Sequence, residues 1–341
     1  MLDARYLREN FEEASARLIN RGKGVSERLA QFKALEDQRI VLMQEVQDLQ
    51  TERNSVSKEI GVLKRNQQDA SELLERMQTV AAECKDKEVR LRELDDQANE
   101  VLLWIPNFPD ETTPIGQTEE DSVEVRQWRE PIQLPFEPRP HWELAEQLGI
   151  IDWERGSRLS GSRFWLMRGQ GARLERCLYN FMLDLHTQKH GYHEIYPPYL
   201  ALRESMIVSA QIPNLEEDMF STQDDLYLIP TAEVALTALH RGEILEAADL
   251  PKRYCAFSAC FRREAGAAGK DSRGLIRRHQ FNKVELYKFT TPETSDEELA
   301  KLVTDAEAVL QALELPYRVL DICTGDLDRK STRLNSSHRI R

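Results

Sequence analysis

The chain has 341 residues, of which 40% are hydrophobic and 31% charged, and its formal net charge at pH 7 is -13. That length indicates about two domains, and because no run of ~18 apolar residues occurs, we expect no membrane helix. The acidic balance by itself argues against nucleic-acid binding, which needs Lys and Arg. Net charge is a weak criterion, however, because a local basic groove can lie on an acidic protein.

The cysteines and the N-terminus bear on the cellular compartment. Five scattered cysteines form no C-x-x-C pair, which favours buried thiols in a reducing cytosol over disulfides or a zinc site. They are Cys84, Cys177, Cys255, Cys260 and Cys323. The first residues include Asp3, and no apolar stretch follows them, so we expect neither a secretory signal nor a transit peptide. A cytoplasmic protein without a membrane partner is predicted.

Long helices are predicted after a shorter amphipathic helix, which runs from about Ala4 to Ile19 and ends near Gly22. Side chains at a spacing of seven form two series offset by three, as in the a/d seam of a coiled coil. The series are Leu35, Leu42, Leu49, Val56 and Leu63, and Phe32, Arg39, Val46, Arg53 and Ile60. A second run alternates steps of four and three. It comprises Leu73, Met77, Val80, Cys84, Lys87, Leu91, Leu94, Ala98 and Val101.

The polar stretch from Lys64 to Ser71 predicts the turn of an antiparallel coiled-coil hairpin over about 26–103. At ~1.5 Å per residue, a helix of roughly 38 residues reaches about 57 Å. Periodicity alone leaves an ordinary dimerising coiled coil as an alternative, because nothing in the heptads specifies a ligand. We assign residues 1–105 to a helical arm and residues 106–116, which are rich in proline, to a linker.

Residues 117–327 are predicted to form an α+β domain in which helices flank an antiparallel sheet. One helix is expected from Ala172 to His186, and another from a capping box, Ser295 and Glu298, to about Leu315. Extended segments are expected at 194–200, 226–229, 253–262, 280–289 and 317–323. Their order is not a regular βαβ repetition, which favours antiparallel pairing.

Two of these strands predict a hairpin with one charged face. Because alternate residues of a strand share a face, Arg262 and Glu264 are expected to point the same way. On the second strand, Phe281, Lys283, Glu285 and Tyr287 share a face. Charges at such positions are costly unless a ligand satisfies them, although a plain hairpin with a solvated face remains the alternative. The intervening loop is basic and rich in glycine; it holds Gly266, Gly269, Lys270, Arg273, Gly274, Arg277 and Arg278.

These segments resemble motifs of class II aminoacyl-tRNA synthetases. Residues 260–264 with 281–285 resemble motif 2, and residues 190–198 resemble motif 1, the dimer-interface element. Within that class, the segment 229–233 is similar to a signature of seryl-tRNA synthetases, and segments 161–164 and 171–176 support the resemblance. The resemblance covers residues 1 to about 327. It implies a homodimeric ligase whose arm and motif 2 loop bind serine tRNA and, by family, selenocysteine tRNA.

The resemblance implies a reaction in which ATP and Mg²⁺ activate L-serine to seryl-adenylate, from which tRNA takes the seryl group. Arg262 would hold the α-phosphate through its fork, and Phe281 would stack on adenine. The implied ATP site comprises Arg262, Arg263, Glu264, Arg278 and Phe281, with Arg262 and Glu264 taking part in catalysis. The implied serine site comprises Thr231, Ala232, Glu233 and Glu285. Glu285 would bind the ammonium, and Thr231 and Glu233 the hydroxyl that alanine lacks.

Other side chains are weighed separately. Arg273, Arg277 and Arg278 are expected to contact ATP or the tRNA acceptor end more than to lie on a solvated face. The histidines at 186, 190 and 193 superficially resemble a metal site. They have no acidic or thiol partner nearby in the sequence, so we expect no direct metal cluster. The Mg²⁺ that the resemblance implies would be bridged by ATP. Cys255 and Cys260 are expected in the core.

The segment 328–341 departs from the family pattern, because it has no hydrophobic period. It is interpreted as a non-native tail that resembles a translated sequencing adapter. Motif 3, the class II helix with a γ-phosphate-binding arginine, is not found, so we expect the chain as written to have little activity. Two alternatives are a non-catalytic tRNA-binding relative that uses the core as a platform and a coiled-coil scaffold, which would explain only the arm.

Overall fold

The structure is a computed structural model that describes residues 2–265 and 274–339. The chain divides into two compact units. Unit 1 comprises Met1–Ser122 and Ile322–Leu334, and unit 2 comprises Val123–Asp321 and Asn335–Arg341. The domain boundaries predicted from the sequence stay predictions. Each unit is described by itself below.

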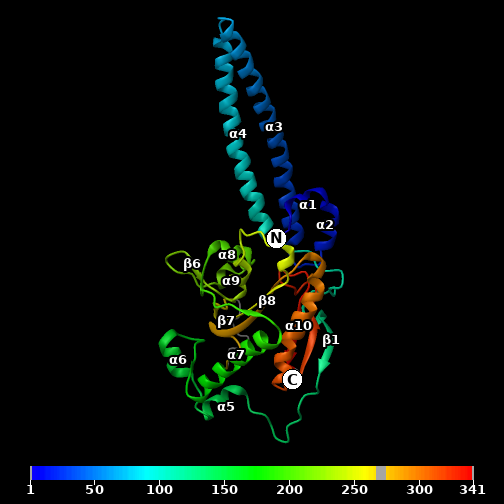
Figure 1. The fold of residues 1–341 in the computed structure, drawn as a ribbon, viewed down its shortest axis with the longest axis vertical. Helices are drawn as coiled ribbons and strands as arrows, with labels where there is room; N and C mark the ends of the chain where they lie inside the picture. Colours follow the sequence, from blue (N-terminus) through cyan, green and yellow to red (C-terminus); the bar gives the residue numbers. More distant parts are fainter. Residues whose placement is uncertain (1, 266–273, 340–341) are drawn as a thin grey trace. The chain divides into compact units, whose positions relative to one another are not determined.

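Unit 1 is built on an antiparallel pair of long helices, α3 (Val25–Arg65) and α4 (Ser71–Leu103), which lie side by side (Figure 1). Two short helices, α1 (Ala4–Glu9) and α2 (Phe11–Leu18), replace the single helix that the sequence predicts. The prediction was wrong at Asn10, whose φ of -129° and ψ of 39° break the helix. A core joins the four helices; it contains Leu7, Ala14, Leu18, Val25, Leu29, Phe32, Ala98, Val101, Leu102 and Ile105.

The predicted seam is confirmed in its apolar positions. Buried seam residues are Phe32, Leu42, Val46, Val56, Ile60, Val80, Cys84, Leu94, Ala98 and Val101. The two arginines of the seam behave differently: Arg39 forms an ion pair with Asp95 across the helices, whereas Arg53 is exposed. Lys87 Nζ lies 2.5 Å from Glu45 Oε2. Polar seam positions are therefore accommodated by ion pairs at the edge of the interface.

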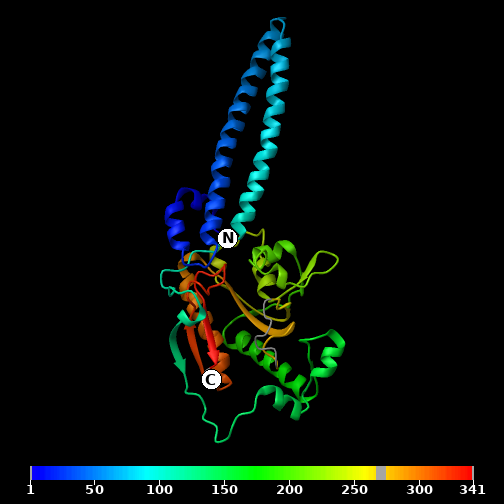
Figure 2. The same ribbon diagram turned by 180° about the vertical axis from the view of Figure 1, so that it is seen from behind.

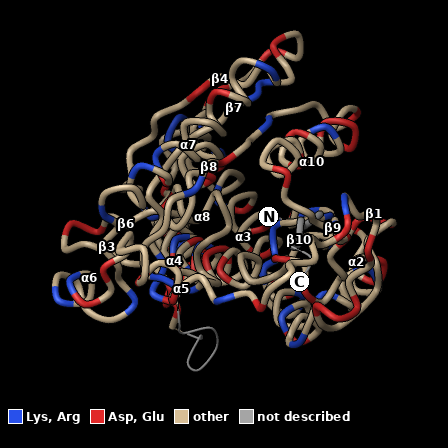
Figure 3. Tube along the Cα trace, turned by 90° about the horizontal axis from the view of Figure 1, so that it is seen from below, with Lys and Arg blue, Asp and Glu red and all other residues tan. Residues whose placement is uncertain are grey.

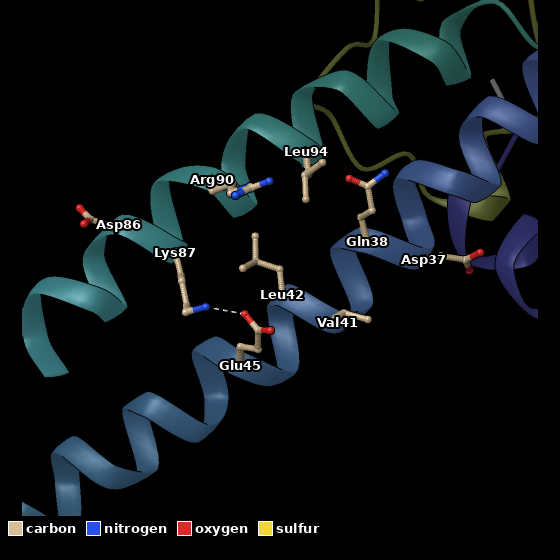
Figure 4. Close-up of a pocket in the computed structure, with 9 residues that line it drawn as sticks. All are labelled: Asp37, Gln38, Val41, Leu42, Glu45, Asp86, Lys87, Arg90 and Leu94. Atoms are coloured by element: carbon tan, nitrogen blue, oxygen red, sulfur yellow. Dashed lines mark hydrogen bonds and ion pairs between the residues drawn. The ribbon is translucent and has the colours of Figure 1, made fainter.

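Near these ion pairs the two helices leave an open groove of about 650 Å³. Figure 4 shows Leu42 and Leu94 directed toward each other between the helices, while Asp37 and Asp86 point outward.

The base of the arm is organised by the buried side chain of Arg21, which is 6% exposed. Its guanidinium donates to the backbone carbonyl oxygens of Asn107, Thr324, Leu327, Asp328 and Ser331 at 2.5–3.3 Å. Burial lowers the pKa of Arg21, and the neighbouring Asp328 opposes that effect. The linker and the segment 322–334 are thus fastened to the end of α2.

Unit 2 contains small sheets covered by helices. Its helices are α5 (His141–Gln147), α6 (Trp153–Ser160), α7 (Gln170–Lys189), α8 (Arg203–Val208), α9 (Glu233–Ala238) and α10 (Ser295–Ala312). Its strands are β1 (Val123–Trp128), β2 (Ile151–Asp152), β3 (Leu166–Met167), β4 (His193–Glu194), β5 (Leu200–Leu202), β6 (Leu226–Leu228), β7 (Lys252–Phe261), β8 (Gln280–Phe289), β9 (Tyr317–Asp321) and β10 (Asn335–Arg339). The strand orders are β1-β9-β10, β2-β3, β4-β7-β8 and β5-β6. Basic and acidic residues are interspersed along α6 and α10 (Figure 3).

The α+β class with mainly antiparallel pairing is confirmed, with three differences in detail. β4 pairs with β7 in parallel, which the sequence does not predict. Ser295 lies inside α10 and not at its cap, because a 3-10 turn at Pro292–Thr294 leads into the helix. Glu298 is therefore free of a capping role and instead accepts bonds from Lys288 and Lys301.

Burial of the thiols agrees with the sequence prediction except at one position. Cys84, Cys255, Cys260 and Cys323 are buried, whereas Cys177 is exposed on α7. Burial raises the pKa of Cys255 to about 11, which makes it a core residue and not a nucleophile. Among the described residues, no helix has the length and apolar character needed to cross a membrane.

Candidate active site

The β7–β8 hairpin is the scaffold of the site (Figure 2). The two strands pair from Lys252 opposite Phe289 to Phe261 opposite Gln280. At the loop end of the hairpin, the amide of Phe261 donates to Ile229 O at 3.0 Å. This hydrogen bond places residues 231–233, which lead into α9, on the same side of the hairpin as the charged residues of β8.

The expected serine-site residues are brought together. Thr231 and Ala232 are 3% and 0% exposed. Thr231 Oγ1 donates to Glu285 Oε2 at 2.6 Å and accepts from the amide of Glu233 at 3.1 Å. Lys283 Nζ lies 2.5 Å from the same oxygen of Glu285. One oxygen of the half-buried Glu285 carboxylate thus has two partners, the Thr231 hydroxyl and the Lys283 ammonium.

The expected ATP-site residues that the structure describes lie at the loop end of the hairpin. The guanidinium of Arg262 lies 4.9 Å from the centre of the Phe281 ring. The backbone of Arg262 bonds His279, whose ring packs against Phe164 and Phe220 at 5.3 and 5.9 Å. One face of Phe281 is therefore covered by Arg262, and the expectation that Phe281 stacks on adenine stays a prediction.

Glu264 does not continue the strand alternation, so the expectation that it points the same way as Arg262 was wrong in its reasoning. β7 ends at Phe261, and Glu264 has a φ of 52°, in the left-handed region. Its carbonyl accepts from Arg163 at 3.0 Å, and its carboxylate lies 3.2 Å from Arg277. The turn is secured by Asp218.

Asp218 accepts from the amides of Arg263 and Ala265, through its carbonyl and its carboxylate, at 2.8 and 2.7 Å. The side chain of Arg263 is exposed. The strained turn therefore presents Arg263 to solvent beside the half-buried Arg262, in a position to meet an anionic ligand.

Arg278 belongs to the second limb of the loop, beside α6. Its guanidinium lies 4.9 Å from the Trp153 ring and donates to Gly274 O. Burial lowers the pKa of Arg278, and the nearby Arg163 lowers it further. A concentration of positive charge that lowers the pKa of an arginine is a favourable place for phosphate oxygens. Arg273, by contrast, lies outside the described residues.

Sequence reasoning missed His141, which contacts the second limb of the loop. Its Nε2 accepts from the amide of Leu275 at 2.8 Å, which requires a neutral ring with the proton on Nδ1. A Cβ on Gly274, whose φ is +72°, would lie 1.9 Å from Nε2. A side chain at position 274 would therefore be strained, and the first turn of α5 holds the backbone at Gly274 and Leu275.

The histidine cluster has an acidic neighbour that the sequence did not reveal. His190 Nδ1 lies 3.0 Å from His186 Nδ1 and 3.6 Å from Asp305, which also accepts from Tyr192 at 2.8 Å. Burial, and after it the neighbouring His190, lower the pKa of His186 to about 4. In the part of the chain that the structure describes, no group of three or more His, Cys, Asp and Glu could hold a metal.

An apolar pocket of about 380 Å³ lies between α7 and β8, on the side of the hairpin where Asn282 donates to Glu175. Its walls include Ile150, Met167, Leu174, Leu178, Met182 and Val284. Leu174 is 56% exposed. α7 leads directly into the segment 190–198 that resembles motif 1.

Comparisons with known proteins accord with this geometry. The model of the seryl-tRNA synthetase N-terminal domain matches residues 1–109, and that of the class II core domain (G, H, P, S and T) matches residues 217–336. A serine--tRNA ligase of Bacillus subtilis (strain 168) is 52% identical over 328 residues, 96% of this chain and 77% of that protein. The chain belongs to the seryl-tRNA synthetase family.

Two further relatives support the assignment. A serine--tRNA ligase of Pelobacter propionicus is 50% identical over 334 residues, which are 98% of this chain and 78% of that protein. The crystal structure of a seryl-tRNA synthetase from Pyrococcus horikoshii complexed with ATP superposes with a TM-score of 0.91 at 34% identity, covering 99% of this chain and 80% of that one. The core-domain match extends to residue 336, into the segment interpreted as a tail. The interpretations of the tail and of motif 3 stay predictions.

Sequence reasoning missed the residues whose side chains form hydrogen bonds with the backbone of the site. Asp218, Arg163 and His141 bond the amides and carbonyls of the hairpin turn and its loop. Asp218 and His141 belong to no motif that the sequence analysis used, whereas Arg163 lies in the segment 161–164 that supports the resemblance. His141 and Trp153 open helices, and that local signal could have drawn attention to them.

Proposed function

We propose that this chain is a serine--tRNA ligase, which activates L-serine with ATP to seryl-adenylate and transfers the seryl group to serine tRNA. The observation that carries the proposal is the bond from Thr231 Oγ1 to Glu285 Oε2, on the hairpin that also presents Arg262. A carboxylate facing a buried hydroxyl fits a small substrate with an ammonium and a hydroxyl group. Selenocysteine tRNA is a second acceptor implied by the family.

In the first step, a carboxylate oxygen of serine attacks the α-phosphorus of ATP and pyrophosphate leaves. In the second, a terminal tRNA hydroxyl attacks the seryl carbonyl and AMP leaves. The chain supplies positioning and charge: Glu285 binds the ammonium, Thr231 and Glu233 lie at the serine end, and Arg262 takes two oxygens of the α-phosphate. Arg263 and Arg278, with Glu264 beside them, would form the rest of the ATP site.

Mg²⁺ would be brought in by ATP and not held by the protein alone. The described residues contain no metal-binding group of their own, while the arginines around the hairpin turn fit a phosphate chain whose remaining charge a divalent ion neutralises. Bound there, Mg²⁺ would supply charge neutralisation on the phosphates. Arg277 lies 3.2 Å from Glu264 and forms an ion pair with that carboxylate.

Two partners complete the proposal. The α3–α4 arm would bind tRNA outside the core, and the apolar pocket beside α7 would be covered by a second copy of the chain. The exposed Leu174 in that pocket supports dimerisation. The family, together with the absence of a spanning helix among the described residues, supports a cytoplasmic location. A non-catalytic tRNA-binding relative is disfavoured, because a binder has no use for a serine pocket.

Calorimetric titration with L-serine and L-alanine tests the proposal. Serine is expected to bind, and alanine to bind far more weakly, since sites that hydrogen-bond a hydroxyl reject its absence by ~10⁴-fold in favourable cases. Glu285→Gln should abolish serine binding. The control is Glu175→Gln, which alters a carboxylate that bonds Asn282 instead. Equal binding of the two amino acids would contradict the proposal, and serine-dependent ATP–pyrophosphate exchange tests separately the expected low activity.

A further inference from the structure

The carboxylate of Glu285 already has a cation on it. Its side chain is 19% exposed, and one oxygen takes both the Thr231 hydroxyl, at 2.6 Å, and the Lys283 ammonium, at 2.5 Å. Lys283 is 32% exposed on its side chain. A carboxylate in such surroundings is costly to leave without a positive partner. In this structure Lys283 supplies the positive charge that the proposed function assigns to the serine ammonium.

Lys283 also lies midway along the row of site residues. Phe281, Lys283 and Glu285 alternate along β8 and share one face of the strand. At ~3.3 Å per residue, the first and third backbone positions lie about 13 Å apart, and the second lies about 7 Å from each. If adenine binds at Phe281 and the serine ammonium at Glu285, the serine carboxylate and the α-phosphate must meet between them. The backbone of Lys283 is located there.

A lysine at position 283 is suited to a charge that changes its partner. Lysine has a compact ammonium on a flexible four-carbon stem, whereas arginine has a planar fork that holds one geometry. The Lys283 side chain is 32% exposed, so its ammonium can leave Glu285 once another cation takes its place there. Since Lys283 is anchored in a paired strand, opposite Ser258, the head can swing while the backbone stays fixed.

We propose that Lys283 is a resident counter-ion that serine displaces. The substrate ammonium takes the place of the lysine on Glu285, so the number of charges at that carboxylate is unchanged. The released lysine ammonium then faces the serine carboxylate and the α-phosphate, the two anionic groups that repel each other before they react. Serine binding thereby delivers a positive charge to the reacting centre. The inference rests on the proposed function and adds a role for Lys283 to it.

A permanent structural ion pair would behave differently from a displaceable one. A displaceable lysine competes with any ammonium ligand. Its removal should therefore strengthen the binding of an ammonium ligand that has no carboxylate for the released lysine to contact. Ethanolamine is such a probe, because it has the ammonium and hydroxyl of serine without the carboxylate. For serine itself, the gain is offset by the loss of the charge that would face its carboxylate.

The experiment measures the affinities of ethanolamine and L-serine by calorimetry for the unchanged chain, Lys283→Met, Lys283→Arg and Lys252→Met. Lys252 lies on the partner strand and pairs with Asp249 at 3.7 Å, so its substitution removes one charge from the hairpin away from Glu285. In Lys283→Met, ethanolamine should bind about two- to fivefold tighter, and serine should gain less. Lys283→Arg keeps a cation on Glu285 and should show no gain.

The possible results separate the two levels of the argument. If the unchanged chain binds serine in preference to alanine but ethanolamine does not bind Lys283→Met more tightly, the counter-ion proposal is wrong and the proposed function stands. If the unchanged chain binds neither ligand, both the counter-ion proposal and the proposed function are wrong. A gain that also appears in Lys252→Met would be a general effect of charge and would overturn the assignment to Lys283. Thermal unfolding of each variant confirms that the folded chain was titrated.

Discussion

The substitution Lys288→Met tests a buried ion pair that joins β8 to α10. Lys288 Nζ lies 2.9 Å from Glu298 Oε2, and the two side chains are 4% and 6% exposed. The same ammonium donates to Glu298 O at 3.3 Å and lies 3.8 Å from Asp305. Methionine keeps the length of the apolar stem and removes the charge, so packing changes little while the ion pair is lost.

The expected destabilisation follows from what remains around Glu298. Removing one partner of a buried pair costs ~3–5 kcal/mol, mainly because the other charge is left uncompensated. Here Lys301 at 2.9 Å and Arg253 at 3.6 Å still face Glu298. We therefore expect the lower end of that range, about 3 kcal/mol. The double substitution Lys288→Met/Glu298→Met should lose less than Lys288→Met alone, because it leaves no buried carboxylate.

The ion pair also predicts a pH dependence. The pKa of Glu298 is lowered from 4.5 to about 2, first by the hydrogen bond from Lys301 and then by that from Lys288. Because the folded-state pKa lies below the unfolded one, this contribution is complete above the unfolded pKa and is lost as pH falls from about 5 toward 2. Lys288→Met should lose less stability over that interval than the unchanged chain.

Urea titration followed by tryptophan fluorescence is the assay, since Trp128, Trp142, Trp153 and Trp165 all lie in unit 2. Lys252→Met is the matched control: it makes the same change on the same hairpin beside a more exposed partner, and should cost under about 0.5 kcal/mol. If Lys288→Met is as mild as the control, or if the losses at Lys288 and Glu298 simply add, the argument from burial is refuted.

Three other predictions concern ligands. Thr231→Val keeps the side-chain shape but removes the hydroxyl that bonds Glu285, and should weaken serine binding about tenfold in calorimetry, with the alanine affinity unchanged as the contrasting readout. Arg262→Lys keeps the charge and loses the fork, and should weaken ATP binding about tenfold; an unchanged ATP affinity would remove Arg262 from the phosphate site. Replacing residues 26–103 by a short loop should abolish salt-sensitive tRNA binding on filters while serine binding persists, and retained tRNA binding would exclude the arm as the tRNA site.

The arm could be predicted from sequence because its helices contact each other at a fixed period. Each heptad position repeats the same neighbourhood, so Phe32, Val46 and Ile60 were all placed correctly. Glu36 was not foreseen, although it is 5% exposed, because besides the local ion pair with Arg39 it bonds Arg8 on α1, at no fixed spacing from it. Long-range ion pairs leave no periodic trace in a sequence.

The candidate site was predictable in its strands and not in its turn. Strand alternation placed Lys283 and Glu285 on one face, and they form an ion pair there. It failed at Glu264, where the bonds of Asp218 to the backbone around it hold a left-handed turn. The position of Asp218 depends on how segments between β6 and β7 fold back, which local propensity does not encode.

The guanidinium of Arg21 has a mechanical consequence for the arm. At ~1.5 Å per residue, α3 is a lever about 60 Å long, so a tilt of about 2° at its base moves the tip by about 2 Å. The tip at Asn66–Ala70 is fixed by its own short turn, whereas the base is fixed by carbonyl groups that converge on one side chain. The position of the distal end is therefore set at the base of the arm. An isosteric substitution that removes the charge of Arg21 would make the position of the tip less well defined, although every residue of the tip stays unchanged.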